Sequence, residues 1–165
     1  MMASASLPGS RASASRSGPD AAPTSRVAFS RIADTVRGVS ADEAIIDGEA
    51  VVFRDDGRSD FHALLTKHGW EQPALVAFDL LRVSSDDLRQ RPLEARREAL
   101  MRLVAKRRGD GILFNEALAE EGAVAFVKAC ELGLEGIVSK RAGSLYRSGQ
   151  SRNRLKTKNP DFIRT

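Results

Sequence analysis

The chain has 165 residues, of which 42% are apolar and 29% are charged, and its formal net charge is +4. This length fits one domain, and the composition is that of a globular protein with too little continuous apolar sequence for a membrane span. The single Cys130 excludes an internal disulfide and indicates a reducing compartment. His62 and His68 face different directions on a helix, so a histidine-pair metal site is poorly supported.

Residues 1–25 form a segment rich in Ser and Ala, in which Leu7 is the only large apolar residue besides two methionines. Such a composition cannot bury a core, so we expect a disordered tail. It also has features of an organellar transit peptide, but it lacks an amphipathic pattern.

The remaining residues alternate between helical and strand patterns. We expect a helix over 29–36, a strand over 43–54 that bends near Gly48, a helix capped by Ser59, a buried strand over 74–81, a turn over 84–87, a helix over 92–107, a strand over 111–115, a helix over 119–132, and strands over 135–141 and 154–158. The expected fold class is α+β with a mostly antiparallel sheet.

The positive charge is concentrated at the end of the sequence. Between Lys140 and Thr165 there are eight Lys or Arg residues, and Asp161 is the only acid. Such a cluster attracts phosphates of a nucleotide or of nucleic acid, and the alternative is a solvated basic tail.

Acidic side chains interrupt two apolar strands. Asp47 and Glu49 project from one face of the first strand, which then has to meet cations, donors or water. Asp79 needs a partner inside its buried run. The neighbouring Phe78 is either a core residue or a platform on which a base stacks. The alternative for the first pair is a strand end in solvent.

Three residues near the C-terminus extend this chemistry. Glu135 opens a strand directly after a helix, where its carboxylate could bind a divalent cation or be an ordinary charged strand end. Lys156 and Lys158 project from the same side of a strand, as two point charges on a polyphosphate would require.

Together these segments resemble the adenylation domain of ATP-dependent DNA ligases, most closely the bacterial end-joining repair type. The resemblance covers about residues 26–165. It rests on four motifs in the family's order and approximate spacing, Asp47-Gly48-Glu49, Phe78-Asp79-Leu80-Leu81, Glu135-Gly136-Ile137-Val138 and Leu155-Lys156-Thr157-Lys158.

The resemblance implies a partial nucleotidyltransferase fold, ATP-grasp-like, with mostly antiparallel sheets flanked by helices. It also implies ATP and Mg²⁺ or Mn²⁺ as cofactors, and nicked duplex DNA and repair-complex proteins as partners in DNA repair and recombination. The implied location is the bacterial cytoplasm, with the nucleoid. The roles it implies are adenine stacking by Phe78, ribose or metal-site contacts by Glu49, metal binding by Glu135 and phosphate binding by Lys140, Lys156 and Lys158.

Three departures from the family pattern bear on activity. The family's nucleophile is the lysine of a Lys-x-Asp-Gly motif, which none of the six lysines of this sequence matches, so we expect no catalytic lysine here. Arg154 stands where the family usually has Trp. The sequence also ends before the family's OB-fold domain.

Three hypotheses therefore stay open. The first is a ligase-family fragment that cannot adenylate itself. The second is a non-catalytic module that binds ATP or DNA through its basic strand. The third is sealing of DNA that is already adenylated, which needs no lysine nucleophile.

Overall fold

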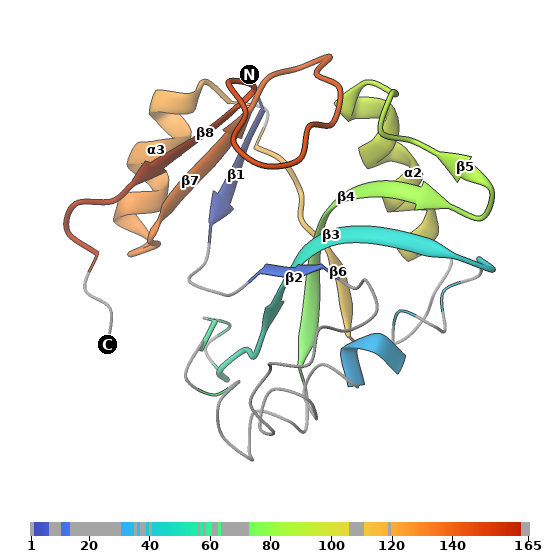
Figure 1. Cartoon of the computed structure of the whole chain (residues 1–165). Coiled ribbons are helices and arrows are strands. Elements are labelled where there is room, and N and C mark those ends of the chain that lie inside the picture. The colour runs from blue at the N-terminus through green and yellow to red at the C-terminus, as the bar shows by residue number, and fades with distance from the viewer. Residues whose placement is uncertain are drawn as a thin grey trace.

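The computed structural model describes residues 2–6, 11–13, 31–34, 36, 39, 41–55, 57, 59–60, 63, 73–105, 111–118 and 120–162. Within these residues the chain forms two sheets (Figure 1). The three-stranded sheet consists of β1 (Met2–Ser6), β7 (Gly136–Lys140) and β8 (Arg154–Lys158), in the order β1-β7-β8.

The five-stranded sheet contains the two longest described strands, β3 (Ala44–Val51) and β4 (Ala74–Val83). The short strands β2 (Arg11–Ser13) and β5 (Asp86–Asp87) extend it on either side. These pairings are antiparallel, whereas β6 (Ile112–Phe114) pairs with β4 in parallel. The predicted α+β class with mostly antiparallel sheets is confirmed.

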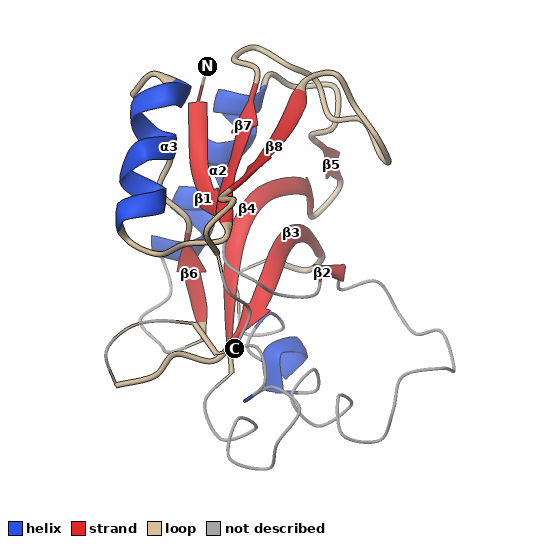
Figure 2. Cartoon of the chain, turned by 90° about the vertical axis from the view of Figure 1, so that its left-hand side faces the viewer, coloured by secondary structure: helices blue, strands red, loops and turns tan. Residues whose placement is uncertain are grey.

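Each sheet is covered by a helix (Figure 2). Helix α2 (Leu93–Ala105) packs on β4 and β6, where Leu100 and Leu103 join the main core. Helix α3 (Gly122–Glu131) packs on β7 and β1, and its Ala125 and Ala129 contact Ile137. The remaining face of each sheet is left without a helix among the described residues.

Helix α2 follows the pattern expected from the sequence. Pro92 directly precedes it, which suits the first turn of a helix because proline has no N–H to leave unpaired. Leu93, Leu100 and Leu103 are buried as predicted. Helix α3 ends before Gly133, whose φ of +68° is a left-handed conformation that favours glycine.

The first 25 residues differ from the prediction of a disordered tail, because residues 2–6 and 11–13 are strands. Strand β1 pairs with β7 from Met2↔Lys140 to Ser6↔Gly136, and β2 pairs with β3. The expectation of disorder considered only whether the side chains can be buried. Edge strands are also held by backbone hydrogen bonds to a neighbouring strand, which small Ala and Ser residues can make. Residues 7–10 and 14–25 lie outside the described part of the chain.

The predicted helix at Ser59 is mostly outside the described residues. Ser59 itself forms an isolated bridge with Phe53. The side chain of Asp60, not that of Ser59, accepts a hydrogen bond from the Ala63 amide at 3.0 Å. Most of the helix that Ser59 was expected to cap lies outside the described residues.

The predicted bend near Gly48 is a change of register between β3 and β4. Asp47 pairs with Asp79 and Gly48 with Ala77, so Phe78 is an extra residue on β4 at this point. A Cβ at position 48 would lie 2.7 Å from the Val76 carbonyl oxygen, so only glycine fits against β4. The resulting bulge changes the direction in which the side chains of β4 point around Phe78.

Candidate functional site

The face of the five-stranded sheet away from α2 carries two of the candidate residues. Ile46, Ala50, Leu75 and Ala77 belong to the core under α2. Glu49 pairs with Val76, and Val51 with Ala74, so these residues point to the opposite face. Phe78 is half-buried there and packs against Val51, Ala74 and Val76.

The face of the three-stranded sheet away from α3 is basic. Ile137 points toward α3, so Val138 and Lys140 point away from it. Across the antiparallel pair, Lys140 is opposite Arg154, Val138 is opposite Lys156, and Gly136 is opposite Lys158. Directly opposite residues share a face, so one surface presents four cations.

The two faces come together at three charged residues, Glu49, Glu135 and Lys156. The Lys156 Nζ atom donates a hydrogen bond to Glu135 Oε1 at 2.9 Å. Glu49 is only 8% exposed, and the charges of both Glu135 and Lys156 act on its carboxyl group. Residues from β3, from the start of β7 and from β8 therefore meet in the space between the sheets.

Phe78 and Lys140 form a second contact between the sheets. The Lys140 ammonium lies 5.9 Å from the centre of the Phe78 ring, within cation–π range. Burial lowers the pKa of Lys140, an effect opposed by the carboxylates of Asp79 and Asp47. An aromatic face beside a cation suits a ligand that has both a flat ring and negative charge.

The six predicted site residues thus lie on the two facing surfaces. Glu49, Glu135 and Lys156 meet in one cluster, Phe78 and Lys140 in another, and Lys158 is exposed on the face that carries Lys156. Glu135 is 7% exposed, so neither it nor Glu49 is an ordinary solvated strand end.

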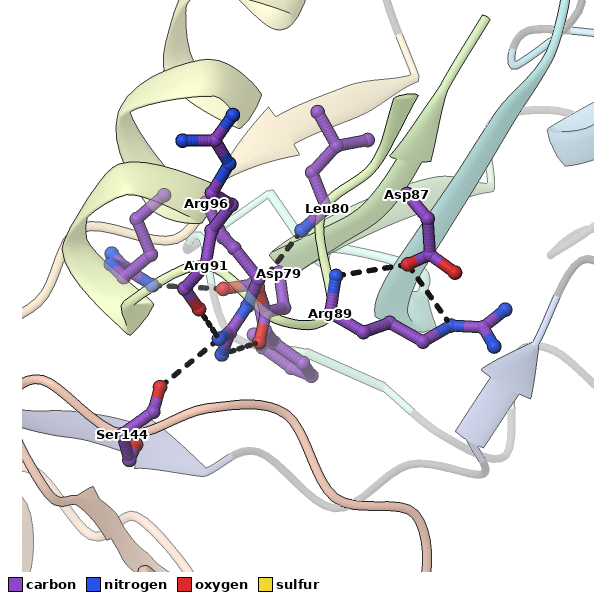
Figure 3. Close-up of polar contacts among 9 residues, drawn as sticks. Asp79, Leu80, Asp87, Arg89, Arg91, Arg96 and Ser144 are labelled. Carbon is purple, nitrogen blue, oxygen red and sulfur yellow. Dashed lines mark hydrogen bonds and ion pairs between the residues drawn. The ribbon is translucent and has the colours of Figure 1, made fainter. Parts of the chain in front are cut away.

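The partner of Asp79 was not found from the sequence. It is Arg96 of α2, which holds both carboxylate oxygens, at 2.8 and 2.9 Å (Figure 3). Arg97 donates to the Phe78 carbonyl oxygen at 3.0 Å, so it also reaches back to β4. A signal was present, because Arg96 and Arg97 occupy positions three and four residues after the inward-facing Leu93.

The cluster fits a divalent cation only if the ligand supplies further oxygens. The described residues contain no group of three or more His, Cys, Asp or Glu that could hold a metal ion. Glu49 and Glu135 offer carboxylates, and their mutual repulsion helps to raise the pKa of Glu49. Magnesium is commonly bound by one or two carboxylates together with substrate phosphates, which this donor set would allow.

The buried Glu49 makes stability depend on pH. Burial, reinforced by the charge of Glu135 and opposed by that of Lys156, raises its pKa from 4.5 to about 7. The folded state therefore holds this proton more tightly than the unfolded state. The stabilising contribution is complete below pH 4.5 and is lost as the pH rises through about 7. We expect the loss to be about 3 kcal/mol.

Glu49→Gln tests this expectation, because glutamine stays neutral throughout. The free energy of unfolding of the wild type minus that of the variant should fall between pH 4.5 and 7, as measured by urea denaturation at several pH values. Glu98→Gln, on the exposed side of α2, is the control and should give a flat difference. A flat difference for Glu49→Gln would contradict the assigned pKa.

Comparison with known proteins agrees with this geometry. The family profile described as ATP dependent DNA ligase domain matches residues 9–158. The chain belongs to this ligase family. The matched range begins inside the segment that was predicted to be a tail, and it includes β2.

Two curated relatives illustrate the match. The multifunctional non-homologous end joining protein LigD of Pseudomonas aeruginosa is 40% identical over 124 residues, covering 73% of this chain and 15% of that protein. A DNA ligase of Hyperthermus butylicus is 31% identical over 134 residues, covering 68% of this chain and 21% of that ligase. The chain therefore spans about a fifth or less of the length of these relatives.

Solved ligase structures share the fold. The crystal structure of the ligase domain of Mycobacterium tuberculosis LigD has a TM-score of 0.74 and 27% identity, and the match covers 95% of this chain and 53% of that chain. A mycobacterial DNA ligase D complexed with ATP and MES has a TM-score of 0.58 and 30% identity, and the match covers 70% and 38%. The expected ligase nucleotidyltransferase fold is confirmed.

No helix in the described part of the chain is both long enough and apolar enough to cross a membrane.

Proposed function

We propose that the two facing surfaces form the ATP-binding site of a DNA ligase adenylation domain. The main support for this proposal is that acidic and basic groups from β3, β8 and the start of β7 lie close together beside Phe78. The ligase relative that was solved with ATP supports this choice of nucleotide. In this arrangement adenine stacks on Phe78, while Lys140, Lys156 and Lys158 neutralise the phosphates.

Glu135 and Glu49 would hold a divalent cation against the same phosphates. Bound there, Mg²⁺ or Mn²⁺ would neutralise part of the negative charge of the ATP phosphates. The hydrogen bond between Lys156 and Glu135 orients this carboxylate from the opposite strand. Glu49, placed next to the ribose, would contact a hydroxyl or complete the metal site.

ATP binding by this chain does not require that the chain also becomes adenylated. None of the six lysines in the sequence stands in a Lys-x-Asp-Gly motif, so no amine matches the family's nucleophile. Burial lowers the pKa of Lys140, but Lys140 does not stand in this motif either. We therefore propose that this chain binds ATP without forming a lysyl-AMP bond.

Two measurements on one preparation test this proposal. Calorimetric titration with ATP and magnesium should show binding, and intact mass spectrometry should show no AMP adduct. Base stacking on an aromatic side chain contributes roughly 1–3 kcal/mol, so Phe78→Ala should weaken binding by about 10- to 100-fold. Phe53→Ala, at an exposed phenylalanine after β3, is the matched control.

A second pair of variants examines the phosphate contacts. Lys156→Ala should weaken ATP binding, whereas Lys128→Ala on the exposed side of α3 should not. A stoichiometric AMP adduct would falsify the separation of binding from adenylation. Equal affinities for wild type and Phe78→Ala would contradict the adenine position.

DNA is the proposed macromolecular partner, as nicked duplex, with repair-complex proteins as further partners in the bacterial cytoplasm at the nucleoid. The names of the relatives support this choice. The exposed side chains of Arg152, Lys156 and Lys158 favour the alternative of a non-catalytic DNA-binding module. Duplex binding that weakens steeply with salt, without ATP binding, would favour that module. Sealing of a preadenylated nick would instead show retained catalysis.

A further inference from the structure

The buried ion pair of Asp79 and Arg96 is part of a set of contacts that extends beyond β4. Each side chain is only 3% exposed. Arg96 Nε and Nη2 donate to the two oxygens of Asp79, which is the bidentate arrangement that an arginine fork allows. The carboxylate thus neutralises the guanidinium, and Arg96 is poorly suited to bind a phosphate itself.

The third nitrogen of Arg96 serves a different purpose. Its Nη1 atom donates to the carbonyl oxygen of Arg91 at 2.7 Å and to that of Ser144 at 3.0 Å. Ser144 belongs to the loop over residues 141–153, which joins β7 to β8 (Figure 1), and Figure 3 shows its contact with Arg96. One buried side chain of α2 therefore links β4, the segment just before α2 and this loop.

Other hydrogen bonds connect the same part of the loop to α2 and to the segment just before α2. The Gly143 amide donates to both Glu94 carboxylate oxygens, at 2.9 and 3.1 Å. The Tyr146 amide donates to the Arg89 carbonyl oxygen at 3.0 Å. The Arg96 guanidinium carbon lies 6.0 Å from the centre of the Tyr146 ring.

The fastened loop forms one wall of a pocket. Tyr146, Arg147 and Asn153 line this pocket together with Asp47 and Lys140. Lys140 is also the residue over the Phe78 ring. The position of the loop therefore decides which polar groups stand beside the proposed nucleotide site.

We propose that Arg96 is a positioning residue that holds the 141–153 loop in the geometry required for ATP binding. This inference rests on the proposed function, and it adds a residue outside the motifs by which the ligase resemblance was established. Arg96 lines the same pocket, and it acts through its contacts to Ser144 and Tyr146. Lysine could keep the charge at position 96, but it cannot make a bidentate contact and reach two carbonyl oxygens together.

Arg96→Lys is the test, with Arg102→Lys on the exposed side of α2 as the matched control. Hydrogen exchange should accelerate by about tenfold or more at the Gly143 and Tyr146 amides. Exchange should stay unchanged at the Leu75 amide, which donates to Gly111 in the sheet. ATP affinity should fall by about tenfold in the same variant and stay unchanged in the control.

A second variant loosens the loop without touching the buried pair. Glu94→Gln weakens the contact to Gly143, and it should accelerate exchange in the loop and lower ATP affinity to a smaller extent. If Arg96→Lys leaves loop exchange unchanged, or if it accelerates the sheet and the loop equally, the positioning role is overturned.

The two proposals fail in different ways. If the wild type binds no ATP, the proposed function fails, and the nucleotide role of Arg96 fails with it. If the wild type binds ATP, and Arg96→Lys frees the loop without changing affinity, only the positioning role is overturned.

Discussion

Asp79→Ala should lower the free energy of unfolding by about 3–5 kcal/mol, because it leaves the buried Arg96 guanidinium without its carboxylate partner. Urea denaturation at neutral pH measures this loss. The change should appear in the denaturation midpoint, with little change in the slope, since the folded surface stays nearly the same.

The control for this variant is Asp87→Ala. Asp87 pairs with Arg89 at 3.7 Å, and both side chains are about half exposed. Exposed pairs contribute about 0–1 kcal/mol, so a small effect is expected. The double variant Asp79→Ala/Arg96→Ala should lose less than the sum of the two single variants, since it removes both charges. Additive losses would contradict a coupled pair.

Gly136→Ala should lower the free energy of unfolding by about 3 kcal/mol or more, because strain and overlap act at the same residue. Gly136 has a φ of +150°, which side-chain-bearing residues rarely adopt. An added Cβ would overlap the Thr157 carbonyl oxygen and lie 2.9 Å from the Lys158 Cα atom. These are backbone atoms of β8, so the strands themselves would have to separate. Thermal unfolding followed by circular dichroism measures the loss.

Separation of β7 from β8 should also disturb the proposed site, since Glu135 and Lys156 face each other across this pair. The matched control is Gly143→Ala, at a φ of +69° with no atom within 4 Å of the added Cβ. Only the left-handed conformation is penalised there, at about 1–2 kcal/mol. Equal losses for the two variants would show that overlap with β8 is not the cause.

Most elements could be predicted because their causes are local. β4 has a mostly apolar run, and α2 has inward leucines after a proline. β7 begins after the glycine that ends α3. The parallel direction of β6 was not predicted, since an apolar run of three residues carries no information about its neighbour.

The site was only partly predictable for the same reason. Residue types and spacing indicated the carboxylates, the lysines and the aromatic residue, because catalysis on phosphates requires those groups. The sequence also showed that Asp79 needs a partner. It did not identify Arg96, because the helical spacing after Leu93 indicates only an inward face, whereas the pairing across 17 positions depends on how α2 packs on β4.

The sequence by itself determined the ligase family, the residue types of the site and the order of most strands and helices, since these depend on local pattern and motif. Only the tertiary structure decided that Glu49 lies beside Glu135, that an extra residue at Phe78 shifts the register of β4, and that Arg96 holds the 141–153 loop. Each of these depends on segments brought together by sheet pairing and burial. The pKa of Glu49 and the orientation of Arg96 follow from that packing and are absent from the isolated segments.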